Sequence, residues 1–114
     1  MVYTNALQFR GEGAVLFEWD EHKRQECISK HGVDLMFAAS IFDGETVTWQ
    51  DRRYEYEELR FCAVGVIEGQ HYVVVFTWRG DAIRLISARK GGRRDRQRYQ
   101  DRFIGRISGD AEKG

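Results

Sequence analysis

Three apolar segments joined by very short links constrain the fold of this chain more than any other feature. They span residues 60–67, 72–78 and 82–89, and they are rich in the β-branched and aromatic residues that favour strands. Glu68-Gly69-Gln70 separates the first segment from the second, and Arg79-Gly80-Asp81 separates the second from the third. Because links this short join antiparallel neighbours, we predict that the three segments form a meander.

The N-terminal half predicts a strand that leads directly into a helix. Residues 14–19 form the predicted strand, and Asp20 is placed to cap a helix that runs to about His31. Gly32 can then adopt the left-handed conformation that commonly ends helices. We expect His31 to interact with the carbonyl groups at this helix end and to pack near the sheet, rather than to act in catalysis.

A second helix is predicted over residues 35–42, with Asp34 as its N-cap. Its residues are apolar nearly all round, so we expect this helix to be buried against the sheet. Asp43-Gly44 ends it, a short strand is predicted at residues 46–49, and an acidic loop follows over residues 50–58.

A last helix is predicted over residues 93–107. Tyr99, Phe103 and Ile107 are spaced at i, i+4 and i+8, which places them on one apolar stripe that faces the core, with arginines on the remaining surface.

The length of 114 residues is sufficient for one hydrophobic core, so we predict a single domain over residues 1–114, with residues 1–13 and 108–114 loosely ordered. The element order predicts an α+β fold: an antiparallel sheet with the N-terminal helices on one face, a C-terminal helix, and an uncovered face available for binding. The two cysteines, Cys27 and Cys62, are too few for a disulfide framework or a zinc site, and no apolar run is long enough to span a membrane. We therefore expect a cytoplasmic protein without cofactor or metal.

The charge of the chain is divided between its halves. Residues 1–59 carry 6 Lys/Arg and 12 Asp/Glu, a net charge of −6, whereas residues 60–114 carry 12 and 6, a net charge of +6. Ten of the basic residues fall within residues 79–106. Such asymmetry is typical of a surface that faces a polyanion or an acidic protein partner, and a solvated helix face with intrahelical ion pairs is the alternative.

A glycine pair, Gly91-Gly92, stands between the last predicted strand and the arginine-rich helix. Glycines at such a junction allow backbone N–H groups to approach an anion, and the positive end of the helix dipole points the same way. Neighbouring arginines can hold a phosphate with fixed geometry. The hypothesis from the residues alone is a phosphodiester site.

Several short motifs occur in a specific order over residues 17–103. They are Phe17-Glu18-Trp19-Asp20, Lys30-His31-Gly32-Val33, Ala38 with Phe42, Glu58-x-Arg60, Ile83-Arg84-x-Ile86-Ser87-Ala88-Arg89-Lys90 and Arg96-x-x-Tyr99. Taken together, this ordered set resembles the BrnT toxin family.

The resemblance implies a RelE-like fold and a metal-independent ribonuclease that cleaves mRNA and arrests translation. It also implies a cognate BrnA-type antitoxin that neutralises the toxin, with promoter DNA bound only through the antitoxin complex. A non-catalytic RNA-binding or protein-binding module of the same fold is the alternative. A DNA-binding regulator is a weaker reading, because no recognition-helix pattern is present.

Metal-free RNA cleavage requires a group that takes the proton of the 2′-hydroxyl, cations that stabilise the phosphorane, and a donor for the leaving oxygen. Arg60, Arg79 and Arg89 are the predicted clamps on the phosphate, Tyr99 is a candidate proton donor or base, and Glu58 is a second candidate base. Further contacts with RNA phosphates are predicted for Lys90, Arg84, Arg93 and Arg94.

Each candidate also has a purely structural explanation. Arg60 can pair with Glu58, Arg79 can lie exposed in its tight link, and Arg89 can pair with a carboxylate from the acidic half of the chain. For Tyr99 we favour packing on the core stripe, because buried tyrosines usually satisfy their hydroxyl in this way.

Overall fold

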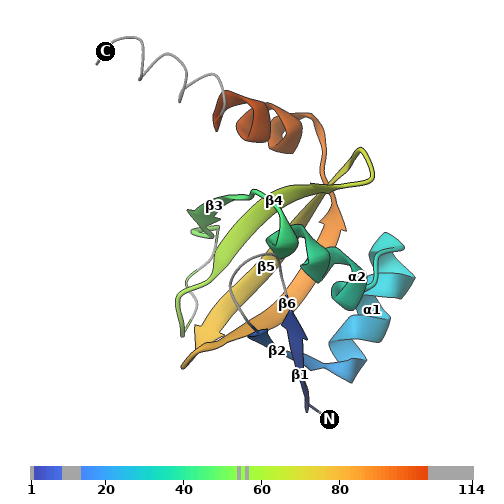
Figure 1. Ribbon diagram of the computed structural model, residues 1–114, viewed down its shortest axis with the longest axis vertical. Coiled ribbons are helices and arrows are strands. Elements are labelled where there is room, and N and C mark those ends of the chain that lie inside the picture. The colour runs from blue at the N-terminus through green and yellow to red at the C-terminus, as the bar shows by residue number, and fades with distance from the viewer. Residues whose placement is uncertain (1, 9–13, 54, 56, 103–114) are drawn as a thin grey trace.

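The computed structural model describes residues 2–8, 14–53, 55 and 57–102, and it shows a six-stranded sheet with helices packed around it (Figure 1). The strands are β1 (Val2–Gln8), β2 (Ala14–Asp20), β3 (Val47–Gln50), β4 (Phe61–Ile67), β5 (Gln70–Arg79) and β6 (Ala82–Lys90). The helices are α1 (Glu21–His31), α2 (Leu35–Ala38) and the 3-10 helix η1 (Ala39–Asp43), and residues 93–102 form a C-terminal helix. The strand order in the sheet is β1-β2-β6-β5-β4-β3.

The predicted meander is confirmed. Strands β4, β5 and β6 are antiparallel neighbours, with Val64 opposite Val73 and Val73 opposite Arg89. The turn between β4 and β5 places Glu68 and Gly69 at φ values of 49° and 82°. Such left-handed backbone matches the twist of a tight hairpin and explains why a glycine stands there.

The prediction of an antiparallel sheet is wrong at one junction. Strand β2 lies parallel to β6, with Phe17 opposite Ile83, so the sheet is mixed. Parallel neighbours need a long crossover, and here the whole chain from α1 to β5 forms it. A second correction concerns Val2–Gln8, which was predicted as part of a loosely ordered segment and instead forms β1, antiparallel to β2.

The predicted helix caps are confirmed. The carboxylate of Asp20 accepts a hydrogen bond from the His22 N–H at 2.8 Å, and Asp34 accepts one from the Met36 N–H at 2.9 Å. Gly32 ends α1 at φ 67°, in the left-handed region. The single helix predicted over residues 35–42 is in fact a short α2 followed by η1.

The main core lies between the sheet and the helices α1, α2 and η1, which cover one face (Figure 1). Phe17, Leu35, Ile41 and Leu85 are among the largest side chains that are fully buried there. One side of the second helical segment is therefore buried against the sheet, as predicted, whereas Phe37 on its other side is 46% exposed.

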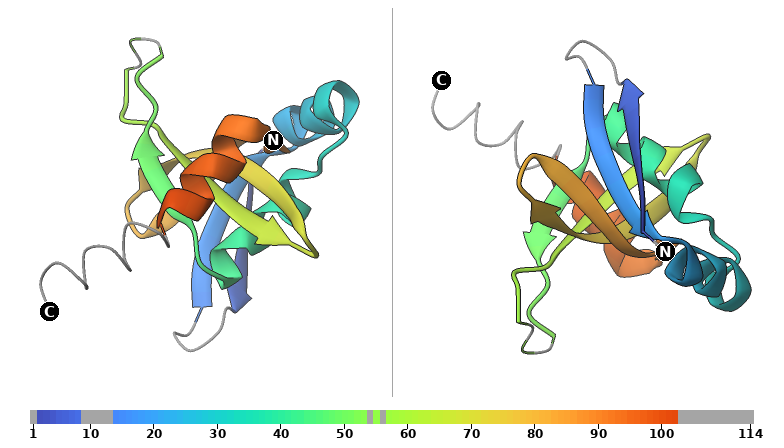
Figure 2. Two further views of the ribbon diagram at one scale, coloured as in Figure 1. Left: turned by 90° about the horizontal axis from the view of Figure 1, so that it is seen from above. Right: turned by 90° about the horizontal axis from the view of Figure 1, so that it is seen from below.

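A smaller cluster lies on the opposite face of the sheet. It contains Cys62, Val64 and Val73, with Tyr99 of the C-terminal helix packed against it. This helix crosses one end of the sheet (Figure 2), and no other helix formed by the described residues covers that face. Of the predicted apolar stripe only Tyr99 can be placed, because Phe103 and Ile107 lie outside the described residues, as do residues 9–13 and 108–114.

A β-bulge in β6 decides which of its residues face which way. Val75 lies opposite Ser87, but Phe76 lies opposite Leu85, so Ile86 is the extra residue. Side chains of a regular strand alternate between faces, and a bulge shifts that alternation by one residue. Leu85 therefore faces the main core, whereas Ser87 faces the opposite side of the sheet.

Candidate active site

Arg60 and Arg89 line one cavity on the sheet face opposite the main core. Arg60 directly precedes β4, and Arg89 is the penultimate residue of β6. The cavity has a volume of about 200 Å³, and its floor includes Val73 and Val75 of β5. The bulge in β6 is what turns Arg89 toward this side, since Val73 lies directly opposite it in the ladder.

A buried carboxylate fixes the position of Arg89. Asp95, only 8% exposed, accepts hydrogen bonds from Nη1 of Arg89 at 2.7 Å and from Nη2 at 3.4 Å. Burial of Asp95 by itself would raise its pKa, but the bonds from Arg89 and from the Gly92 N–H outweigh burial and lower it. Asp95 is therefore ionised at neutral pH. The partner of Arg89 comes from the basic half of the chain, whereas the structural alternative considered for Arg89 was a carboxylate of the acidic half.

The glycine pair does not offer its N–H groups to a ligand. The Gly91 N–H donates to the backbone carbonyl of His71 at 2.8 Å, and the Gly92 N–H donates to the Asp95 carboxylate at 2.9 Å. The anion at this helix N-terminus is thus the side chain of Asp95 itself, in the manner of a capping box. The prediction that these glycine N–H groups bind a phosphate is therefore corrected, because both are engaged in a capped junction that orients Arg89.

A second carboxylate–arginine pair, which the sequence analysis did not find, borders the same cavity. The side chain of Asp51 is 1% exposed and accepts hydrogen bonds from Nε and Nη2 of Arg53, both at 2.9 Å. Asp51 directly follows β3, and its N–H donates to the Arg60 carbonyl at 2.8 Å. The only sequence signal was an Asp-x-Arg at the end of a short strand, which is too common to indicate a site.

The cavity shares lining residues with a larger cleft of about 900 Å³ between residues 49–53 and the start of the C-terminal helix. Six arginines and two aspartates line it: Arg52, Arg53, Arg89, Arg93, Arg94 and Arg98, with Asp51 and Asp95. We call this region the arginine cleft. At its rim the guanidinium of Arg98 lies 3.8 Å from the centre of the Trp49 ring, a cation–π contact.

Cys62 lies on the floor of the arginine cleft. Burial raises the pKa of its thiol, and the nearby Asp51 carboxylate raises it further. Because the thiolate is the nucleophilic form, both effects make Cys62 a weaker nucleophile.

Arg79 and Glu58 are not brought to this cavity. Nη2 of Arg79 lies 3.5 Å from Oε2 of Glu58, at the end of the β5–β6 hairpin, and the Arg79 side chain is 51% exposed. The structural alternative considered for Arg60 was a pair with Glu58, but the ion pair that Glu58 makes is with Arg79.

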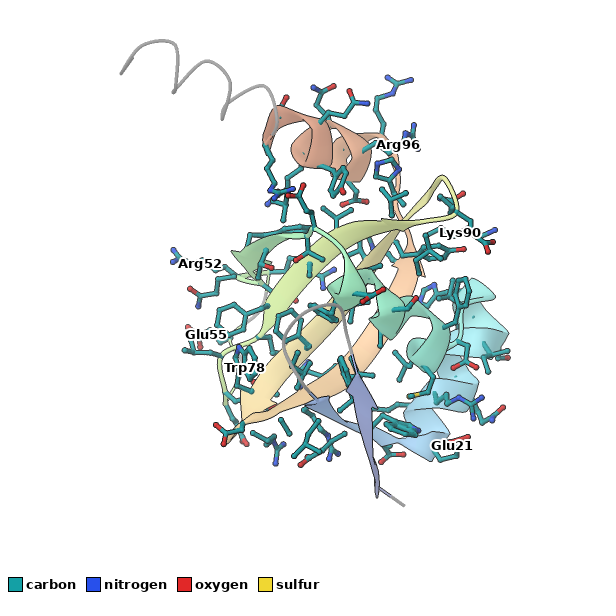
Figure 3. The ribbon with its side chains drawn as sticks, in the orientation of Figure 1. Glu21, Arg52, Glu55, Trp78, Lys90 and Arg96 are labelled. Atoms are coloured by element: carbon teal, nitrogen blue, oxygen red, sulfur yellow. The ribbon has the colours of Figure 1, made fainter. Side chains whose placement is uncertain are left out.

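The remaining predicted residues lie in three separate places. The Tyr99 hydroxyl donates to the Glu45 carbonyl at 3.4 Å, and its ring packs on the smaller cluster, which agrees with the packing explanation. Arg84 pairs with Glu18 at 3.5 Å across the β2–β6 junction. Lys90 is exposed at the edge of the molecule opposite Arg52 (Figure 3).

Arg93 and Arg94 line the arginine cleft, and the phosphate contacts expected of them stay a prediction. Residues 19–95 of the chain match a protein family described as the ribonuclease toxin, BrnT, of type II toxin–antitoxin systems. The chain belongs to the BrnT family. No individual curated protein matches it.

The region that matches the family covers all the residues that line the cavity. It includes both carboxylate–arginine pairs and Arg60, and it ends at Asp95, the residue that holds Arg89. Within the described residues of this BrnT chain, no three His, Cys, Asp or Glu side chains gather as metal ligands, and no helix is long and apolar enough to cross a membrane.

Proposed function

We propose that this BrnT-family chain cleaves RNA at the cavity lined by Arg60 and Arg89, by a reaction that needs no metal. One observation supports the proposal most directly. Arg60 stands at the start of the meander and Arg89 near its end, yet both side chains line the same cavity. The buried Asp95 fixes Arg89 in a defined orientation, which is what a preorganised electrostatic site requires.

The reaction that suits these groups is attack of the neighbouring 2′-oxygen on phosphorus. The P–O5′ bond breaks, and a 2′,3′-cyclic phosphate and a 5′-hydroxyl are the products. Guanidinium groups stabilise the additional negative charge of the phosphorane, and they cannot be deprotonated in the process. Removing one such donor from a preorganised site typically costs about 100- to 1,000-fold in rate.

The finer biological role also belongs to the proposal. In a RelE-like arrangement of sheet and helices, the toxin cleaves mRNA in the cytoplasm and arrests translation, and a cognate BrnA-type antitoxin neutralises it. Promoter DNA is bound only by the antitoxin complex. Membership of a toxin–antitoxin family and the excess of arginine in the cleft support this role.

Single-turnover cleavage of a single-stranded RNA tests the catalytic proposal. We expect Arg60→Ala and Arg89→Ala each to lower the rate by about 100-fold. Arg96→Ala is a matched control, because Arg96 is exposed on the C-terminal helix and lines neither the cavity nor the arginine cleft. If wild-type protein binds RNA but leaves it intact, the non-catalytic binding module is the correct function instead.

Heparin chromatography tests the role of the antitoxin. If the antitoxin covers the arginine cleft, the complex elutes from heparin at lower salt than the free toxin, and co-expression of the adjacent small gene restores growth to cells that express the toxin. Equal retention of toxin and complex would contradict the proposed antitoxin interface.

A further inference from the structure

His31 lies at the cavity that Arg60 and Arg89 share. It is the last residue of α1, it is exposed, and it lines the cavity together with Ser87 of β6. In the part of the chain that the structure describes, its side chain makes no hydrogen bond or ion pair. His31 is therefore not a histidine that is buried in the hydrophobic core.

The expectation that His31 contacts the carbonyls of its helix end is wrong. The carbonyls of Cys27 and Ile28 accept hydrogen bonds from the Gly32 N–H, and Cys27 also accepts one from the Val33 N–H. The backbone of the left-handed cap therefore satisfies these acceptors, and the imidazole is left to face the cavity.

The other groups that line the cavity are poorly suited to carry a proton near neutral pH. Asp51 is buried and bound by two nitrogens of Arg53, and the Ser87 hydroxyl accepts from the Cys27 thiol at 3.7 Å. Arginines stay protonated. A histidine side chain ordinarily titrates near pH 6.5, within the range in which general bases work well.

We propose that His31 is the general base of RNA cleavage, an inference that rests on the proposed function of the cavity. The neutral imidazole takes the proton of the 2′-hydroxyl while the 2′-oxygen forms its bond to phosphorus. The P–O5′ bond then breaks, the 5′-oxygen takes a proton from water, and the imidazolium returns its proton to the hydroxide so formed. Arg60 and Arg89 neutralise the phosphorane during the step.

The neighbouring charges of His31 come from two sides. Asp51, Arg53, Arg60 and Arg89 face it across the cavity. Lys23, Glu26 and Lys30 of α1 share a shallow surface hollow with it on the other side. The His31 and His22 variants described below leave all of these charged residues in place except the histidine that each one replaces.

The chain offers a matched control for this test. His22 lies on the same helix, its side chain is 83% exposed, and its Nε2 is 3.8 Å from Glu26. It lines neither the cavity nor the arginine cleft. His22→Ala thus removes an equivalent imidazole without touching the proposed site.

The experiment measures single-turnover cleavage of single-stranded RNA at saturating protein, from pH 5 to 9. We expect His31→Ala to lower the rate by about 100-fold or more. We also expect unchanged RNA affinity and melting temperature, loss of the rising arm of the pH profile, and partial rescue by added imidazole. His31→Gln keeps a polar side chain of similar reach and is expected to be as slow as His31→Ala.

The outcomes separate this inference from the proposed function. If wild type cleaves RNA, Arg60→Ala and Arg89→Ala are slow, and His31→Ala equals His22→Ala in rate, then the inference on His31 is overturned and the cavity keeps its function. A His31→Ala variant that is slow without rescue or altered pH profile likewise contradicts a proton-transfer role. If wild type leaves RNA uncut, the proposed function itself fails.

Discussion

Replacement of Asp95 by Asn tests the carboxylate that supports both Arg89 and the C-terminal helix. The change preserves the shape of the side chain but removes the negative charge of the carboxylate. That carboxylate accepts hydrogen bonds from Nη1 of Arg89 at 2.7 Å and from the Gly92 N–H at 2.9 Å. Charge-assisted hydrogen bonds contribute about 1.5–3 kcal/mol, and loss of a helix cap costs about 0.5–2 kcal/mol. Because the Arg89 side chain is 41% exposed, water replaces part of what is lost, and we expect a destabilisation of about 1–3 kcal/mol.

Urea denaturation measures this loss, and its pH dependence identifies the cause. The pKa of Asp95 is lowered in the folded state, so its stabilisation is complete above its unfolded pKa and disappears as the pH falls through the folded value. The stability difference between wild type and Asp95→Asn should therefore shrink as the pH falls below about 4. Asp101→Asn is the control, because Asp101 is exposed on the same helix and bonds only Gln97 among the described residues.

Cleavage by the same variant tests whether Asp95 positions Arg89. We expect Asp95→Asn to slow single-turnover cleavage by about 10- to 100-fold, with little further loss when it is combined with Arg89→Ala, because residues that share one interaction do not act additively. Unchanged cleavage by Asp95→Asn would refute the positioning role. A double variant whose loss equals the product of the two single losses would refute the coupling.

Three further predictions concern other parts of the molecule. Gly65→Ala should destabilise the fold by about 1–3 kcal/mol in urea denaturation, because its Cβ would lie 2.6 Å from Cβ of Ile41 and η1 would have to shift; unchanged stability would contradict the close approach. Arg79→Ala should slow cleavage less than threefold, since Arg79 does not line the cavity, and a large loss would return it to the catalytic set. Combined Arg93→Ala and Arg94→Ala should weaken RNA binding and reduce its salt slope by about 1.4, that is, roughly 0.7 for each phosphate contact, while the rate at saturation stays within threefold of wild type.

Local sequence signals predicted the elements that depend on neighbouring residues. The meander followed from links too short for any other connection, and both N-caps followed from an aspartate placed before a helical segment. Gly32 was predictable because few other residues adopt its left-handed conformation at low cost. In each case the residues that determine the feature lie in the same short stretch of chain as the feature itself.

Two of the missed features depend on residues that are distant in sequence or on a change in strand register. The parallel pairing of β2 with β6 joins segments more than sixty residues apart. The bulge at Ile86 leaves no trace in composition, yet it decides that Arg89 faces the cavity. Position along the chain made Arg79 as good a candidate as Arg89, and only the three-dimensional arrangement separates them.

The arginine cleft contains two kinds of arginine, one suited to attracting RNA and one suited to stabilising a transition state. Arg53 and Arg89 are each paired with a buried aspartate, which reduces their contribution to the net charge but fixes the direction of their remaining N–H donors. Arg93 and Arg94 are exposed and make no ion pair among the described residues, so they contribute net positive charge without fixed geometry. Charge of the second kind attracts substrate and transition state equally and changes affinity, whereas only oriented donors can favour the phosphorane over the phosphodiester. The rate of the chemical step should therefore follow Asp95 and Arg89, and the salt dependence of binding should follow Arg93 and Arg94.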